Sequence, residues 1–309
     1  MMLKSPTDSF GMVPGTDPPQ LPLSLKAVRV AANGTSRAIS PWLYHLIDGA
    51  SCHRLKVDDH LDGIEVIGID ACKPNSLSRT VLYLHGGAYF LGSVWTHREF
   101  LARASSAWGA RIIAVNYRLA PENPFPAALD DALAAWFWVK QKYPEDDIAV
   151  AGDSAGGNLA VALLVRLAQM GAPQPAVCIT ISPLLNLKRR AVVKTGMSKM
   201  YLQGHPPDDP QASPLLAPMD LMRRFPPVVI HAARDEYLSR DAKDMAALCK
   251  SAGVPVELAL FPDVWHGFQC LPGVFRRASR ESLSEIRRFW DAHSRSGQES
   301  RPRLIQAAL

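Results

Sequence analysis

The sequence predicts an α/β fold in which a mostly parallel β-sheet is flanked by helices. Short apolar segments of strand length alternate along the chain with longer segments whose apolar residues have helical spacing. The strand segments are almost continuously apolar, as in a sheet that is covered on both faces. With 309 residues, 48% of them hydrophobic and 20% charged, the chain is long enough to bury the core that such a sheet requires.

Seven segments have the composition of buried strands. They are residues 63–69, 80–84, 111–117, 147–151, 176–181, 227–232 and 256–261. Helices are expected between or after them, at residues 96–108, 127–142, 155–170, 239–252 and 272–293. Strands that alternate with helices indicate parallel pairing, because each helical crossover returns the chain to the same edge of the sheet.

Two stretches interrupt this alternation. Residues 1–24 are rich in Pro, Gly, Asp and Ser, and residues 25–50 have helix-like apolar spacing with breaks. Residues 184–224 lie between two expected strands and are longer than a simple crossover. We expect this second stretch to be an insertion over the carboxyl edge of the sheet, where open α/β folds bind ligands.

Charge and composition exclude several classes of partner. The net charge of +5 comes from dispersed basic residues rather than from a basic stripe interleaved with aromatics, so no nucleic-acid partner is expected. No apolar run reaches 18 residues and the N-terminus lacks the apolar core of a secretory signal, so no integral membrane association is expected. Five scattered cysteines without C-x-x-C spacing indicate neither disulfides nor zinc, which predicts a reducing, cytoplasmic location.

Residues 152–156 read Gly-Asp-Ser-Ala-Gly and lie between an expected strand and an expected helix. G-x-S-x-G in this context is the nucleophile-elbow pattern, in which a tight turn raises the serine hydroxyl above the end of the sheet. Ser154 is therefore the expected nucleophile, and the backbone N–H of Ala155 is an expected oxyanion donor. Because Gly-Asp-Ser also occurs in ordinary turns, the interpretation requires a base and a second donor elsewhere.

A serine hydroxyl needs a base to accept its proton and an acid to orient that base. His266 lies just past the last expected strand, in a loop at the carboxyl edge, and is the expected base. His231 falls within a strand and is expected in the core. The other histidines after Ser154 are His205, in the insertion, and His293, near the C-terminus.

The orienting acid should follow the strand at 227–232. That strand leads directly to Asp235, which we favour as the acid. Glu236 is an adjacent alternative that requires the loop to be rotated, and Asp241 is expected on the surface of the next helix.

A second oxyanion donor is expected after the strand at 80–84, where the sequence reads His-Gly-Gly-Ala-Tyr. Glycines permit an unusual turn with exposed backbone amides. Gly86, Gly87 and Ala88 are the candidate donors, and the sequence leaves open which of them act. His85 is expected to hold the turn through hydrogen bonds rather than to serve as a second base.

With these residues, the chain resembles the bacterial hormone-sensitive-lipase-like esterases (bacterial family IV), which carry HGG and GDSAGG motifs. The matching motifs are HGGAYFLGS (85–93), YRLAPE (117–122), FPAA (125–128), GDSAGGNL (152–159) and WHGF (265–268). The family's acid precedes a turn that carries a second Asp, which corresponds here to Asp235 and Asp241. The chain departs from the family at Ala88, where a third glycine is usual, and at the basic residues 188–190.

The resemblance implies an α/β-hydrolase fold, with a mostly parallel eight-stranded sheet and a helical cap. Residues 1–48 and 184–224 would form the cap, and residues 49–183 and 225–309 the core. It also implies a serine carboxylesterase that hydrolyses short- to medium-chain carboxylic esters through an acyl-enzyme, without metal or cofactor. Homodimers through the last strand and last helix are a further implication.

Other functions use the same residues. A non-catalytic small-molecule receptor can have this fold, although such receptors lose the base. An amidase, a lactonase or a lipase can use the same Ser, His and acid. No long apolar lid helix is evident, which disfavours a lipase.

Overall fold

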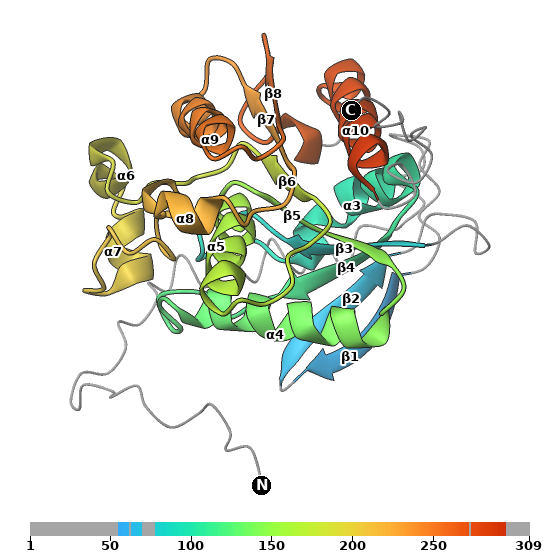
Figure 1. The fold of residues 1–309 in the computed structure, drawn as a ribbon, viewed down its shortest axis with the longest axis horizontal. Helices are drawn as coiled ribbons and strands as arrows, with labels where there is room; N and C mark the ends of the chain where they lie inside the picture. Colours follow the sequence, from blue (N-terminus) through green and yellow to red (C-terminus); the bar gives the residue numbers. More distant parts are fainter. Residues whose placement is uncertain (1–54, 62, 70–77, 272, 295–309) are drawn as a thin grey trace, which may run out of the picture.

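Eight strands form one sheet in the order β1-β2-β4-β3-β5-β6-β7-β8 (Figure 1). The computed structural model describes residues 55–61, 63–69, 78–271 and 273–294, without the side chains of 55–61 and 191. The strands are β1 (Leu55–Leu61), β2 (Ile64–Ile69), β3 (Arg79–Leu84), β4 (Arg111–Asn116), β5 (Asp147–Asp153), β6 (Cys178–Ile181), β7 (Val228–Ala233) and β8 (Val256–Phe261).

In sheet order, β4, β3, β5, β6, β7 and β8 pair in parallel. Strand β2 is antiparallel to both of its neighbours, β1 and β4. The predicted mostly parallel sheet is therefore confirmed. The apolar pattern did not reveal β1, whose sequence, LKVDDHL, carries charged residues. A strand at the edge of a sheet pairs on one side only and need not be a continuous apolar run.

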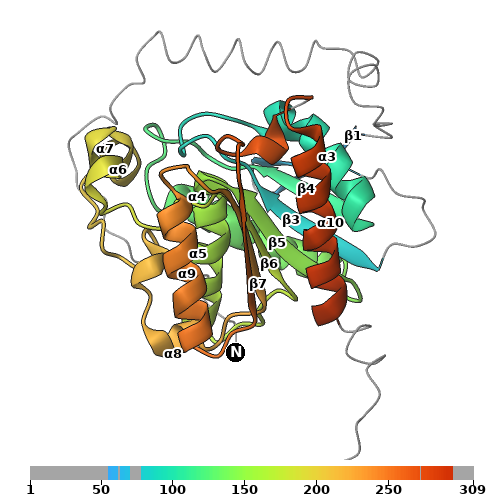
Figure 2. The same ribbon diagram turned by 90° about the horizontal axis from the view of Figure 1, so that it is seen from above.

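The main helices cover both faces of the sheet (Figure 2). They are α3 (Val94–Trp108), α4 (Ala127–Lys142), α5 (Ala155–Gln169), α9 (Ser239–Ser251) and α10 (Arg276–His293). Buried residues of α4, α5 and α9 form one hydrophobic core, and those of α3 and α10 form a second core on the opposite face. These helices match the predicted ones within one residue at each end, apart from two starts. Helix α10 begins at Arg276 rather than at residue 272. Helix α3 begins earlier than predicted because Ser93 caps it: its side chain accepts a hydrogen bond from the Thr96 N–H.

The connection from β6 to β7 contains the short helices α6 (Arg190–Lys194), α7 (Met197–Leu202) and α8 (Met219–Met222) and a 3-10 turn, η2 (Pro214–Leu216). Helices α6 and α7 lie on the side of α5 and α9, away from α10 (Figures 1 and 2). The amide of Asn158 in α5 donates to the carbonyls of Leu184 and Ala212, at 2.8 and 2.9 Å. Residues 1–48, expected to complete a cap, lie outside the described residues.

Asp241 lies in the first turn of α9 and is completely buried, so its expected place on the surface is wrong. Its carboxylate accepts hydrogen bonds from the backbone N–H groups of Leu185 and Asn186, at 2.7 and 3.0 Å, and from the Arg189 side chain. The start of the β6–β7 connection has backbone donors that no strand satisfies, and Asp241 supplies their acceptor. Asp241 therefore ties this connection to α9.

Parallel pairing brings four chain segments to one edge of the sheet. The residues that follow β3, β5, β7 and β8 all lie beyond the carboxyl ends of neighbouring parallel strands. His85, Ser154, Glu236 and His266 belong to these segments. None of the described helices is apolar over a length sufficient to cross a membrane.

Trp290 of α10 provides a test of the second core. It is completely buried and its indole N–H donates to Asp147 Oδ2 at 2.9 Å. We expect Trp290→Phe to lower the free energy of unfolding by about 1–3 kcal/mol, because a half-buried hydrogen bond to a carboxylate is lost. Urea denaturation measures this loss. Trp265→Phe, at a residue that is 66% exposed, is the matched control and should change stability by less than about 0.5 kcal/mol. Equal losses in the two variants would contradict the expectation.

Candidate active site

Ser154 lies at the turn between β5 and α5, and the strand–turn–helix context predicted for it is confirmed. Its backbone has φ 52° and ψ −116°, a strained conformation for a residue with a Cβ. The end of β6 holds this turn: the Ser154 N–H donates to the Ile181 carbonyl at 2.8 Å, and the Leu184 N–H donates to the Ser154 carbonyl at 3.1 Å.

The two glycines of the motif are required by close backbone packing. A Cβ on Gly156 would lie 2.0 Å from the carbonyl oxygen of Leu84, at the end of β3. A Cβ on Gly152 would lie 2.3 Å from the Gly156 carbonyl oxygen. The turn therefore packs directly against the strand that leads into the His-Gly-Gly segment.

The His-Gly-Gly segment separates the three candidate oxyanion donors. The Gly86 N–H donates to Asp153 Oδ1 at 2.8 Å and is therefore not available to a ligand, so Gly86 does not fit the expected role. The N–H groups of Gly87, Ala88 and Ala155 have no hydrogen-bond acceptor among the described residues. Gly87 has φ 125° and Ala88 has φ 56°, so the turn runs through the left-handed region at both positions.

Asp153, the residue before Ser154, carries a buried carboxylate. Besides the Gly86 N–H, it accepts the Tyr83 hydroxyl at 2.6 Å and lies 3.4 Å from His97 Nε2. Burial alone raises the pKa of Asp153, but the charge and hydrogen bond of His97, together with Tyr83 and Gly86, outweigh burial and lower it to about 2. Asp153 is therefore an ionised anchor below the serine turn.

The hydrogen bonds of Asp153 also indicate whether its surroundings suit a metal ion. Ligand atoms of His97, Asp153 and Cys270 lie within 4.8 Å of one another. Both Asp153 oxygens already have partners in Tyr83, Gly86 and His97. We interpret this group as a hydrogen-bonded support of the turn rather than as a metal centre.

His85 has the surroundings of a structural residue, as the sequence predicted. Its ring is buried, lies 2.8 Å from the Gly86 carbonyl through Nδ1 and stacks on Tyr117 with ring centroids 4.3 Å apart. Burial, followed by the charge of His97, lowers the pKa of His85 to about 4, so the imidazole is neutral near pH 7. A neutral, enclosed ring of this kind positions the turn.

His266 follows β8 and forms a hydrogen-bonded pair with Glu236 from the turn after β7. The bond joins His266 Nδ1 to Glu236 Oε2, while Glu236 Oε1 accepts the Ala233 N–H at 3.0 Å. The next residue, Gly267, donates its N–H to Ser182 Oγ at 3.3 Å, which fixes the loop to the end of β6. The Glu236 side chain is 7% exposed and the His266 side chain 46%, so the carboxylate lies inside and the imidazole lies at the surface.

The structure does not bring Asp235 to His266, so the placement expected for Asp235 is wrong. The Asp235 side chain is 74% exposed and lies 3.6 Å from Arg234. The turn directs alternate side chains in opposite directions, and the bond from Ala233 N–H draws Glu236 inward. This is the rotated loop that the sequence left as the alternative, and no local sequence signal distinguishes the two carboxylates.

The Glu236 carboxylate controls the protonation of His266. Burial lowers the pKa of His266, but the hydrogen bond and charge of Glu236, with a smaller contribution from the charge of Asp153, outweigh burial, so the pKa is raised above its usual value. A histidine held in this way accepts a proton more readily than a free imidazole.

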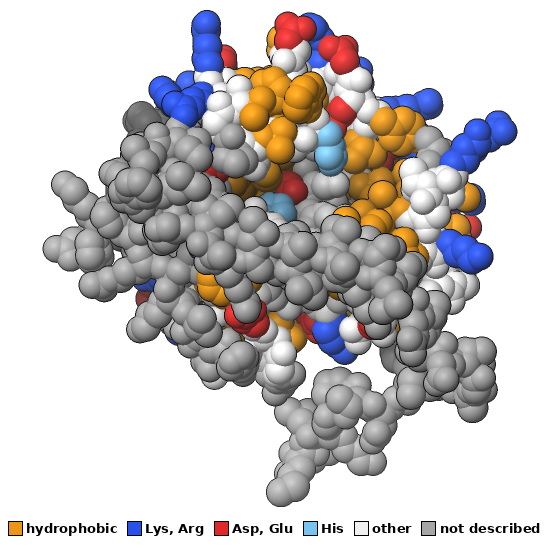
Figure 3. All heavy atoms as spheres, turned by 180° about the vertical axis from the view of Figure 1, so that it is seen from behind, with side chains coloured by type: hydrophobic (Ala, Val, Ile, Leu, Met, Phe, Trp, Pro, Cys, Tyr) orange, Lys and Arg blue, Asp and Glu red, His pale blue; other side chains and the backbone are white. Residues whose placement is uncertain are grey.

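Large exposed side chains are next to the pair in sequence. Trp265 and Tyr237, each next to one member of the pair in sequence, are large exposed side chains. Hydrophobic side chains gather beside histidine side chains on the face shown in Figure 3. A surface of this kind suits an apolar ligand next to a polar reacting group.

Known proteins are similar to this chain over most of its length. Residues 81–270 match a sequence family whose members have the alpha/beta hydrolase fold. An acetyl-hydrolase of Streptomyces hygroscopicus is 39% identical over 219 residues, which cover 65% of this chain and 72% of that protein. An esterase of Acinetobacter venetianus is 32% identical over 231 residues, covering 69% of this chain and 75% of that protein.

Solved structures of similar proteins cover most of the chain. The crystal structure of a hormone-sensitive lipase from a metagenome library has a TM-score of 0.74 at 30% identity and covers 89% of this chain and 93% of its own. The crystal structure of EstE7, a hormone-sensitive-lipase homologue from a metagenome library, has a TM-score of 0.71 at 30% identity, covering 87% and 97%.

The His266–Glu236 pair can be tested without any substrate. We expect Glu236→Gln to lower the pKa of His266, because the neutral amide no longer favours the imidazolium ion by charge. An NMR titration of the His266 ring protons measures the change. Asp235→Asn removes the same charge one residue away and is the control, for which the pKa should stay close to that of the unmodified protein. A larger fall in Asp235→Asn than in Glu236→Gln would refute the pairing.

Proposed function

Because the chain belongs to the α/β-hydrolase family, and within it to the hormone-sensitive-lipase-like esterases, we propose that it is a serine carboxylesterase that cleaves short- to medium-chain carboxylic esters. The observation that carries the proposal is the serine turn at Ser154, placed at the same sheet edge as the His266–Glu236 pair. The name of the acetyl-hydrolase relative supports a short acyl group.

In the proposed mechanism His266 Nε2 takes the proton of Ser154 Oγ as the oxygen attacks the ester carbonyl. Glu236 holds the Nδ1–H and stabilises the imidazolium that forms. His266 then protonates the leaving alcohol, and Ser154 keeps the acyl group as an ester. Water, deprotonated by His266, attacks this acyl-enzyme and releases the carboxylic acid, which restores Ser154.

The tetrahedral intermediates carry a negative oxygen that needs donors already in place. The free N–H groups of Gly87, Ala88 and Ala155 are the donors in this proposal, and Gly86 instead positions the turn through Asp153. Ala88 retains the N–H that the family's third glycine would provide. Its left-handed conformation costs about 1–2 kcal/mol relative to glycine.

Three further features belong to the proposal. Residues 184–224, held by Asn158 and Asp241, act as part of a cap that sets substrate preference. The outer side of edge strand β8, with α10, is the homodimer contact that the family resemblance implies. A cytoplasmic location is supported by Cys178, Cys249 and Cys270, which are free thiols.

Ser154→Ala tests the reaction. With p-nitrophenyl acetate we expect kcat/KM to fall at least about a thousand-fold, because no acyl-enzyme forms. A fluorophosphonate should label the unmodified protein at Ser154 and leave the variant unlabelled. Ser251→Ala, the same change on the surface of α9, is the control and should retain full activity.

Two outcomes would contradict the proposal. Near-full ester turnover by folded Ser154→Ala would exclude Ser154 as the nucleophile. An unmodified protein that binds small esters but is neither labelled nor active would be a receptor. A panel of p-nitrophenyl esters of increasing acyl length, together with anilides and lactones, distinguishes an esterase from a lipase, an amidase and a lactonase.

A second prediction concerns the turn that carries the proposed oxyanion donors Gly87 and Ala88. A Cβ on Gly87 would lie 2.1 Å from the Leu91 carbonyl oxygen, so Gly87→Ala displaces the turn, and we expect kcat to fall about 10²–10³-fold. Ala88→Gly keeps the N–H and should leave kcat within about three-fold. Ester kinetics and circular dichroism measure activity and folding together. A folded Gly87→Ala protein with unchanged kcat would remove Gly87 from the donor set.

A further inference from the structure

A second polar cluster lies outside the active site, between β7, β8 and α10. His231 of β7 is completely buried. Its Nδ1 lies 2.8 Å from Ser282 Oγ, which the amide of Gln269 also reaches at 3.0 Å. The other ring nitrogen, Nε2, is buried and has no hydrogen-bond partner among the described residues. An unpartnered buried polar atom is unfavourable by about 1–3 kcal/mol and calls for a physical explanation.

Strand register brings two carboxylates to this nitrogen. The parallel pairing of β7 with β8 sets Val229 opposite Glu257 and His231 opposite Ala259. Because alternate residues share a face, Glu257 and His231 point to the same side of the sheet. Glu285 comes from α10, one turn after Ser282. Ligand atoms of His231, Glu257 and Glu285 all lie within 4.8 Å of one another.

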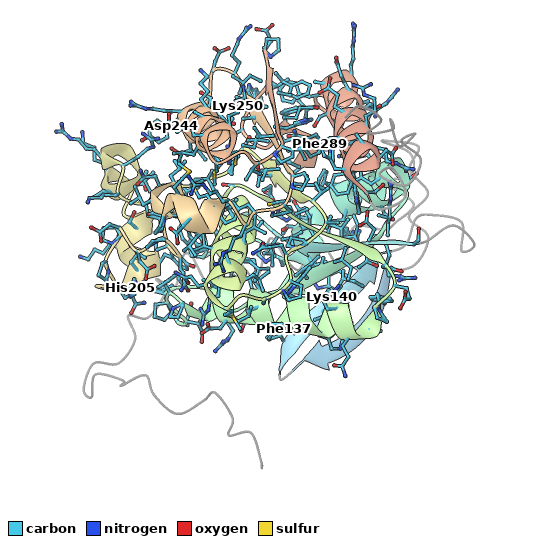
Figure 4. The ribbon with its side chains drawn as sticks, viewed as in Figure 1. Phe137, Lys140, His205, Asp244, Lys250 and Phe289 are labelled. Carbon is cyan, nitrogen blue, oxygen red and sulfur yellow. The ribbon has the colours of Figure 1, made fainter. Side chains whose placement is uncertain are left out.

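The third element, α10, packs on this face of the sheet (Figure 2). Phe289, labelled on α10 in Figure 4, lies one turn beyond Glu285. The 23% exposed Glu285 side chain lies between this packed surface and solvent. The cluster therefore has a buried nitrogen on its inner side and carboxylates that solvent can reach.

The separation of the ligand atoms favours a shared ion over a direct bond. His231 Nε2 and Glu285 Oε2 are 3.9 Å apart, which is too long for a hydrogen bond. Two ligands of one tetrahedral zinc ion lie roughly 3.4 Å apart, because each bond is about 2.0–2.2 Å long. A movement of the Glu285 side chain by about 0.5 Å would close this difference.

The charges at the cluster also favour a cation. Glu257 and Glu285 bring two negative charges to the cluster, and Arg288 supplies one opposing charge. Arg288 approaches the other Glu285 oxygen, Oε1, at 3.6 Å, which leaves Oε2 facing His231.

The neutral imidazole is the form that binds metal ions. Ser282 lies at its other ring nitrogen, where metal-binding histidines usually have a polar partner that fixes the ring. One imidazole nitrogen and two carboxylate oxygens form a ligand set that zinc accepts, with water at the fourth position.

We infer that His231, Glu257 and Glu285 bind one divalent transition-metal ion of the Zn²⁺ type. The ion joins β7, the edge strand β8 and α10, so it stabilises this end of the sheet and takes no part in ester hydrolysis. The proposal therefore does not depend on the proposed function.

Zinc titration of the chelator-treated full chain tests the site. Isothermal titration calorimetry should show one Zn²⁺ per chain, and Zn²⁺ should raise the thermal unfolding midpoint. Glu285→Gln and Glu257→Gln should each weaken binding by at least about ten-fold, because each removes a charged ligand. Glu281→Gln removes the same charge one turn earlier on α10 and is the matched control, for which affinity should stay within about two-fold. Circular dichroism reports that each variant is folded.

Cobalt provides an independent signal. Co²⁺ bound to this site should show visible d–d absorption that Glu285→Gln abolishes. Three results would overturn the inference: no stoichiometric Zn²⁺ binding, an equal loss of affinity in Glu281→Gln and Glu285→Gln, or binding that survives Glu285→Gln and is lost in Cys270→Ser. The last result would place the ion at the His97, Asp153 and Cys270 group instead.

Discussion

The buried carboxylate of Asp153 connects the parts of the candidate active site that come from different strands. It lies at the end of β5, directly before Ser154, and accepts hydrogen bonds from Tyr83 at the end of β3 and from the Gly86 N–H in the next turn. His97 of α3 partly compensates its charge. Taking a charge out of water is unfavourable, and several hydrogen bonds together with an opposite charge are what allow Asp153 to remain ionised.

This one anchor decides how the serine turn and the His-Gly-Gly turn face each other. By engaging the Gly86 N–H, Asp153 leaves the N–H groups of Gly87 and Ala88 as the available donors in that turn. The close contact of Gly156 with the Leu84 carbonyl fixes the distance between the same two segments. Strain at Ser154 and at Ala88 persists because these surrounding contacts specify the backbone more strongly than local preference does.

Much of the candidate site could be predicted from the sequence, because the position of a motif after a strand predicts at which edge of the sheet its residues lie. Ser154 follows the buried strand β5 and His266 follows the edge strand β8, and parallel pairing of β5, β6, β7 and β8 sends both to one edge. The sequence could not predict in the same way whether Asp235 or Glu236 pairs with His266. Adjacent residues of a turn point in opposite directions, and here the bond from Ala233 N–H to Glu236 selects which carboxylate turns inward.

Asp241 and His231 show the same limit at two other places. Each has an ordinary local sequence, one in the first turn of a helix and one within a strand. Asp241 gains its role from backbone N–H groups more than fifty residues earlier in the chain, and His231 gains its neighbours from β8 and α10. Long-range contacts of this kind carry no periodic signal that a pattern of residues can reveal.

By itself the sequence determined the alternation of strands and helices, the serine turn and the edge of the sheet where its partners lie. These follow from local periodicity, from glycines required by close backbone packing, and from the rule that parallel strands end together. Only the tertiary structure decided that Glu236 pairs with His266, that Gly86 serves Asp153, and that Asp241 is buried. The physical reason is that hydrogen-bond donors and acceptors choose partners by position in space, which the folded backbone alone specifies.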